Sequence, residues 1–180
     1  MQIVQSRIAA AAGKMEPQRK NNFMVQIAAP AGIPGGAGKA DMAMIEQSLA
    51  SFAFPSWSVE LGETPWINEI RKWAKGPVKF EASDLVLNDY VDMGVADAIQ
   101  KWSNAVFNLN TGQMGLAEHY KSNGTLILFA PDGSKDREWT LKQVWPRVVK
   151  IGDGDMSDGG QVQITVTLEM DWVEPKKLTA

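Results

Sequence analysis

Hydrophobic and polar residues alternate without a break from Gln161 to Trp172, which is the clearest pattern in the chain. A period of two is typical of a β-strand with one buried and one exposed face. We therefore expect one long strand here, with its apolar side chains in the core of the subunit. The side chains expected to be buried are Val162, Ile164, Val166 and Leu168.

A β-hairpin is predicted just upstream. Residues 124–130 and 137–141 are rich in strand-forming side chains, and residues 131–134, Pro-Asp-Gly-Ser, supply the backbone angles of a chain reversal. The second arm should run on to Ile151, with a bulge or an edge position at Pro146, because proline has no N–H to donate to a ladder. The Gly-rich residues that follow predict a turn.

Two further segments alternate in the same way. Residues 23–27 predict a short strand, and residues 78–87 predict a second strand with a change of phase, and hence a bulge, near Ser83-Asp84. In the second strand the side chains expected to face the core are Val78, Phe80 and Ala82, and those expected to face away from it are Lys79, Glu81 and Ser83.

A helical period predicts one clear helix at residues 95–104, with Asp92 or Gly94 as its cap. Its apolar side chains at helical spacing are Val95, Ile99 and Trp102. Residues 31–38, rich in Gly, Ala and Pro, predict a mobile loop, and residues 40–49 a short helical turn. One clear helix against about six strands predicts a mainly β domain, that is, a β-rich α+β fold.

Composition narrows the class of protein. A chain of 180 residues favours a single domain. No apolar run approaches the roughly 20 residues of a membrane-spanning helix, and the first 13 residues fit a secretory signal poorly. The absence of cysteine excludes disulfides, a thiolate nucleophile and cysteine zinc sites. A net charge of −3 argues against a tight grip on nucleic acid, which depends on many Lys and Arg contacts.

The candidate chemical motifs are incomplete. Residues 32–39 resemble a phosphate-binding loop, but Ile33 stands where its first glycine should be and Ala40 where its Ser/Thr should be. Residues 153–158 carry three Asp, as a calcium loop does, but its twelfth position is Ile164 and not Glu. His119 is the one histidine, with no cysteine partner. We therefore expect no catalytic, cofactor or metal site, although a carboxylate pair brought together by the fold stays open.

Residues 57–73 predict an extended excursion, with breaks at Pro55 and Pro65. Three of the seven tryptophans of the chain lie in it: Trp57, Trp66 and Trp73. Large aromatic side chains in a polar, Pro-interrupted segment serve as core residues or as anchors of a protein interface, and stacking on a sugar is a competing use.

Several short segments occur in this order along the chain: residues 22–27, Pro55, Asn68-Glu69-Ile70, residues 80–89, the helix end Ile99-Gln-Lys-Trp102, Leu141-Lys-Gln-Val-Trp145-Pro146 and residues 166–171. Taken together, they resemble the tail tube proteins of T-even-like contractile phages. The resemblance covers residues 20–173. It predicts an N-terminal arm at 1–21, a tube domain at 22–173 with a loop insertion at 30–48, and a C-terminal tail at 174–180.

The resemblance implies two packed antiparallel sheets, sandwich-like or barrel-like, with one flanking helix. It also implies a structural protein without enzymatic activity or cofactor, in which six copies close into a ring whose inner sheets form a continuous barrel. Stacked rings would form the tail tube of a virion, assembled in the bacterial host cytoplasm, through which double-stranded DNA passes. The implied partners are other copies of the chain, the tail sheath protein, a tape-measure protein, and baseplate and tail terminator proteins, but no membrane.

Two sets of site residues follow as expectations. The contacts between rings or subunits are assigned to Trp57, Trp66, Glu69, Arg71 and Trp73. The lumen is assigned to Glu81 and Ser83, with Glu169 and Asp171 as the second choice. Two alternatives to the phage tube remain open, namely the tube of a phage-derived injection particle of the tailocin type and, from another class, a carbohydrate-binding β-sandwich or a hydrolase.

Overall fold

The computed structural model describes residues 17–30, 38–157 and 159–176. Its elements in chain order are β1 (Phe23–Ile27), α2 (Lys39–Gln47), β2 (Leu49–Phe52), β3 (Trp57–Trp66), β4 (Glu69–Phe80), β5 (Ser83–Asn88), α3 (Val95–Val106), α4 (Ala117–Tyr120), β6 (Ser122–Phe129), β7 (Lys135–Ile151), β8 (Gln163–Glu169) and β9 (Trp172–Lys176). None of the helices in these residues is long and apolar enough to cross a membrane.

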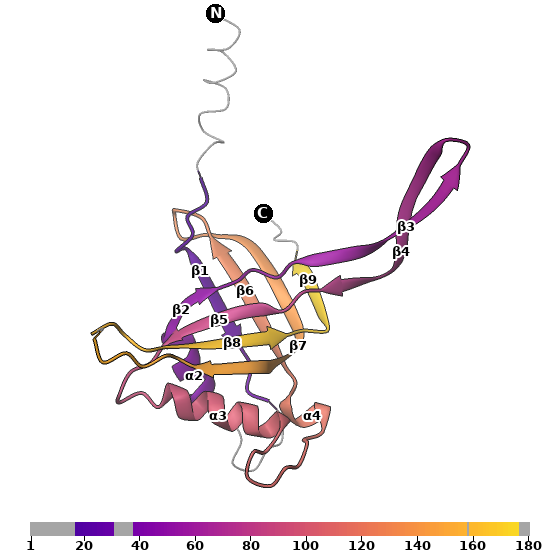
Figure 1. Ribbon diagram of the computed structural model, residues 1–180. Helices are drawn as coiled ribbons and strands as arrows, with labels where there is room; N and C mark the ends of the chain where they lie inside the picture. The colour runs from indigo at the N-terminus through magenta and orange to yellow at the C-terminus, as the bar shows by residue number, and fades with distance from the viewer. Residues whose placement is uncertain (1–16, 31–37, 158, 177–180) are drawn as a thin grey trace, which may run out of the picture.

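The body consists of two antiparallel sheets that share the long strand β7 (Figure 1). The N-terminal half of β7 pairs with β6 and β9, and β6 pairs with β1; we call this the first sheet. The C-terminal half pairs with β8, followed by β5 and β2; we call this the second sheet. The chain changes direction where Gln143 has φ +58° and the register shifts between Pro146 and Val148, so the bulge predicted at Pro146 is confirmed.

The core lies between the two sheets and is closed at one end by helices α2 and α3. Leucine, isoleucine and valine side chains from both sheets are almost fully buried, as is Trp102 of α3, whose indole N–H donates to the Tyr120 carbonyl at 2.9 Å. The fully buried members are Leu85, Leu87, Val95, Ala98, Ile99, Trp102, Leu126, Leu141, Val144, Ile164, Val166 and Leu168. The predicted mainly β fold with two antiparallel sheets is confirmed.

The hairpin at 124–141, the strand at 23–27 and the helix beginning at Val95 are also confirmed. The helical turn predicted near residues 40–49 is the helix α2. The expectations for the first 13 residues, for most of residues 31–38 and for Asp158 lie outside the described residues.

The C-terminal alternation forms two strands and not one. Strand β8 ends at Glu169, and β9 continues on β7 in the first sheet, after a crossing held by the Asp171 N–H, which donates to the Lys142 carbonyl at 3.1 Å. Burial of Ile164, Val166 and Leu168 is confirmed. Burial of Val162 is wrong: the residue precedes β8 and is 43% exposed, because alternation alone does not show where a ladder begins.

Residues 78–87 likewise form two strands. Strand β4 ends at Phe80, β5 begins at Ser83, and the phase of burial changes between them. As a result Val78 and Ala82 are exposed, while Ser83 is buried at 1% exposure beside Leu85. The expected orientations of these three side chains are therefore wrong. Of the three residues of this segment that were expected to face the core, only the half-buried Phe80 packs against it.

Candidate assembly surface

Strands β3 and β4 form a two-stranded hairpin that projects far from the body (Figure 1). It continues the pairing of β2 and β5, and two backbone bonds hold its root: the Ala53 N–H donates to the Asp84 carbonyl at 2.8 Å, and the Glu81 N–H to the Ser56 carbonyl at 2.9 Å. The extended excursion predicted for residues 57–73 is thus a strand pair, with Pro65 inside β3 and not at a break.

One face of this hairpin is apolar except for a single ion pair. Cross-strand pairs place apolar side chains opposite one another: Val59 against Val78, Leu61 against Ala74 and Pro65 against Ile70. We call this the apolar face; its members are Trp57, Val59, Leu61, Pro65, Ile70, Ala74, Val78 and Phe80. Its large side chains other than Phe80 are 37% to 62% exposed. Its only charges, Glu63 and Lys72, neutralise one another at 3.6 Å.

The opposite face carries two tryptophans that lie against their neighbours. The ring of Trp73 covers Gly62, and the Arg71 guanidinium lies 4.8 Å from the ring centroid of Trp66. Glu69 pairs with Trp66 at the end of this face. We call it the aromatic face; its members are Gly62, Thr64, Trp66, Glu69, Arg71 and Trp73.

The tip of the hairpin is a two-residue turn in which both Ile67 and Asn68 have positive φ, at 34° and 64°. Such turns favour Asn and Gly, and a β-branched residue at positive φ is strained by about 1–2 kcal/mol. Ile67 is nevertheless the residue present, and its side chain is 83% exposed. Strained residues of this kind cluster at functional sites.

The five predicted contact residues all lie on the hairpin, but on different faces. Trp66, Glu69, Arg71 and Trp73 lie together on the aromatic face, whereas Trp57 lies on the apolar face. Sequence reasoning missed the aliphatic members of the apolar face. A signal existed in the alternation of residues 57–61, but in β4 the bulge at Gly76 and Pro77 interrupts it.

The apolar face ends at the body in a pocket of about 210 Å³, lined by aromatic and aliphatic side chains. Phe80 meets Trp172 edge-on there, with ring centroids 5.2 Å apart. The other lining residues are Trp57, Val78, Trp139, Val173 and Pro175. This pocket makes the apolar face continuous with the first sheet.

The residues expected in the lumen do not form one group. Glu81 lies at the hairpin root and accepts a hydrogen bond from the Ser58 hydroxyl at 3.0 Å. Glu169 pairs with Arg147, and Asp171 with Lys121 at 2.6 Å. Ser83 is buried in the core, so the assignment of Ser83 to a lumen is wrong.

The outward face of the second sheet is largely polar. Thr165, Thr167 and Glu169 of β8 lie on it next to Asp84 of β5, and the Thr167 hydroxyl donates to the Asp84 carboxylate at 2.7 Å. We call this surface the polar face. Among the four residues expected in the lumen, it contains Glu169.

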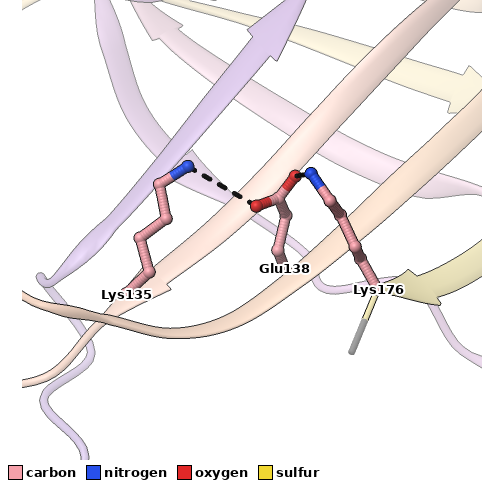
Figure 2. A network of polar contacts seen from close by, with 3 residues as sticks. All are labelled: Lys135, Glu138 and Lys176. Carbon is pink, nitrogen blue, oxygen red and sulfur yellow. Dashed lines mark hydrogen bonds and ion pairs between the residues drawn. The ribbon is translucent and has the colours of Figure 1, made fainter. Parts of the chain in front are cut away.

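Strand β9 is fastened to the first sheet by the carboxylate of Glu138, which lies between two lysines (Figure 2). Its oxygens pair with Lys176 Nζ at 2.8 Å and Lys135 Nζ at 3.5 Å. The hydrogen bond from Lys176, with the positive charges of both lysines, lowers the pKa of Glu138 against the opposing effect of burial. Glu138 is therefore charged at neutral pH and holds the last described residues in place.

No group of three or more His, Asp or Glu side chains in the described residues is placed to hold a metal ion. The lone histidine, His119, is half-buried, and its Nε2 lies 3.7 Å from Glu118 Oε1. Asp155 accepts hydrogen bonds from the backbone and hydroxyl of Ser157, which lower its pKa. The carboxylate of Asp155 is thus satisfied within the turn itself.

Comparison with known proteins identifies the fold. No protein-family model matches the chain, and no curated protein sequence matches it significantly. Among solved structures, a chain of the anti-feeding prophage tube-terminating cap matches with a TM-score of 0.66 and 14% identity, over 91% of this chain and 93% of that one. A chain of the sheath–tube complex of the extracellular contractile injection system PVC matches with a TM-score of 0.61 and 17% identity, over 96% and 97%. A chain of the anti-feeding prophage baseplate gives 0.61 and 14%, over 89% and 96%.

The protein therefore has a fold found in subunits of contractile injection particles. The likeness extends over nearly the whole length of both chains, and at 14% to 17% identity it concerns the fold. The fold expected from the resemblance to contractile tail tube proteins is confirmed.

Proposed function

We propose that this chain is a structural subunit whose copies close into rings, and that the rings stack into the inner tube of a contractile particle. The observation that carries the proposal is the projecting hairpin, which exposes a continuous apolar face on a body with the fold of such particles. The largest contiguous apolar patch on a protein surface is often an interaction site. In a polymer of identical chains, a neighbouring copy can cover this apolar face.

Ring closure accounts for the free edges of the sheets. Strands β1 and β2 end the strand order, so each has one side without a partner among the described strands. Exposed edges invite pairing with other chains, and joining them around a ring removes them. Six copies per ring is the number that the resemblance implies; the anti-feeding prophage baseplate, which has a chain of this fold, was sixfold symmetrised.

The polar face is the surface best suited to a channel. It carries hydroxyls and carboxylates at Asp84, Thr165, Thr167 and Glu169. Its cations are Arg147, which pairs with Glu169, and the exposed Lys150, which lies opposite Thr165. Phosphates of a moving polyanion would find few free cations on such a wall. Glu81 and Asp171 remain candidates for the rims of the channel, since both lie at the ends of strands of the second sheet.

The proposal extends to the cargo of the tube and to its partner proteins. In a phage tail the tube would conduct double-stranded DNA into the host cell. It would contact a sheath outside, a tape-measure protein inside, and baseplate and terminator proteins at its ends, after assembly in the bacterial cytoplasm. The likeness to cap, sheath–tube and baseplate chains supports such partners. Because those chains come from injection particles, the second candidate is the tube of an injection particle that carries no DNA.

Sedimentation of the purified chain over a range of concentrations tests the assembly. Stacked rings predict a sharp rise of very large species above a threshold concentration. A chain that sediments as a monomer at every concentration would contradict the proposal and would favour the binding-domain alternative. Particles isolated from producing cells then separate the two cargoes, since phage particles protect DNA from nuclease and injection particles do not.

A further inference from the structure

A second apolar surface lies at the other end of the body, in the connection between α3 and α4 (Figure 1). No charged residue occurs from Trp102 to Ala117. Four large side chains of this connection are 42% to 77% exposed: Phe107, Leu109, Met114 and Leu116. We call it the receiving loop. Depletion of charge together with exposed Phe and Met is the composition of an interface core.

The receiving loop is held by its own hydrogen bonds and does not expose these side chains through lack of structure. The Asn108 N–H donates to the Gln113 carbonyl at 2.9 Å, and the Asn108 side chain accepts the Asn110 N–H at 2.9 Å. Gly115 packs so closely that a β-carbon there would come within 2.0 Å of the Ala105 carbonyl oxygen. The exposure is therefore built into the fold.

We propose that the receiving loop of one copy binds the apolar face of the hairpin of a second copy, in the next ring; this inference rests on the proposed function. The two surfaces share no residue and lie at opposite ends of the body, so each copy can use both at once. A contact between two different surfaces of identical chains can propagate from copy to copy, and it gives an open polymer when the rotation between copies does not close a ring. The apolar face has one ion pair, Glu63 with Lys72, and no charge left over, so docking on an uncharged loop buries no unpaired charge.

The size of the contact explains why it would act only in a ring. A hairpin arm of ten residues is about 33 Å long and two strands are about 10 Å wide, which gives roughly 300 Å² for one face. A stable pair of proteins needs about 800 Å² on each side. One hairpin–loop contact is therefore weak. Several such contacts, made together by the copies of one ring, reinforce one another as a multivalent interaction.

Cysteine cross-linking tests this contact cleanly, because the chain has no cysteine of its own. Chains with Ile70→Cys are mixed with chains with Met114→Cys under assembly conditions, oxidised, and separated on a non-reducing gel. Two control pairs are matched to it. Thr64→Cys replaces Ile70→Cys and tests the aromatic face, and Val91→Cys replaces Met114→Cys and tests another fully exposed apolar position.

The inference predicts several times more cross-linked dimer for Ile70→Cys with Met114→Cys than for either control pair. Equal or greater product from a control pair, or no product from the test pair, would overturn it. Microscopy of the same samples keeps the two claims apart. Tubes without the predicted cross-link contradict the hairpin–loop contact alone, whereas cross-linked dimers without tubes support the contact and contradict the proposed function.

Discussion

The indole ring of Trp73 covers Gly62 on the neighbouring strand so closely that a β-carbon at position 62 would come within 2.6 Å of the ring. An aromatic ring over a cross-strand glycine shields a stretch of backbone that has no side chain of its own. Among the described residues the hairpin meets the body at its root, so contacts of this kind keep it extended before assembly. The projecting arm is therefore preformed.

Gly62→Val should weaken assembly while leaving the body folded. The added side chain must push Trp73 off the strand, which disturbs the outer part of the hairpin but reaches no core residue. Thermal unfolding of the monomer should change little, and the concentration needed for tubes should rise. Thr64→Val, on the same strand and face, is the matched control. Equal behaviour of the two variants would show that the Trp73–Gly62 contact has no role in presenting the hairpin.

Substitutions on the two faces of the hairpin should have different effects on stacking. Ile70→Asp puts a charge into the apolar face, and an unpaired charge in an interface costs several kcal/mol, so tubes should be lost. Trp66→Ala, on the aromatic face, should weaken stacking by about 2 kcal/mol, because a tryptophan in an interface buries a large area. The critical concentration for sedimentable tubes measures both effects. Normal assembly of Ile70→Asp would remove the apolar face from the contact between rings.

A feature of the fold can be predicted from the sequence when it depends on the residues of one segment alone. The alternation that places Ile164, Val166 and Leu168 in the core is a property of one segment. The exposure of Val162 and the burial of Ser83 depend on where a neighbouring strand begins or ends, which no single segment records. The extended excursion at residues 57–73 could be predicted from its proline breaks and its polar composition, and its assembly role stays a prediction.

The division of the hairpin into two faces could not be derived in the same way. It requires the register that sets Val59 against Val78 and Leu61 against Ala74 across the bulge at Gly76. The receiving loop was missed because its Phe, Leu and Met residues have neither a strand period nor a helical one. Its uncharged composition was the one signal in the sequence that could have indicated it.

Acid should loosen β9 through Glu138. The pKa of this carboxyl is lowered from its ordinary value of 4.5, so its ion pairs stabilise the fold above that value, and the contribution is lost as pH falls below it through the folded-state pKa. Glu138→Gln should therefore lower the unfolding midpoint at pH 7 and flatten its decline below about pH 4.5. Glu118→Gln, an exposed carboxyl, is the control. Parallel pH profiles for the wild type and Glu138→Gln would contradict this role.

A positive charge added to the polar face should slow the passage of DNA through the tube. Thr165→Lys would repeat one added cation per subunit around every ring, and attraction to phosphates grows with each such contact. Tubes should form, but ejection should slow at low salt and recover at high salt, because screening weakens exposed charges. Glu81→Lys applies the same test at the hairpin root. Normal ejection of Thr165→Lys particles at low salt would exclude the polar face from the channel.

Negative-stain electron microscopy of the purified chain, concentrated well above the threshold found by sedimentation, tests the central claim most directly. Stacked rings joined by the projecting hairpin predict hollow tubes of uniform diameter, with end views that show closed rings. The variant Ile70→Asp, prepared in the same way, should give isolated rings or single subunits without tubes. Dispersed monomers of the unmodified chain at every concentration would contradict the account.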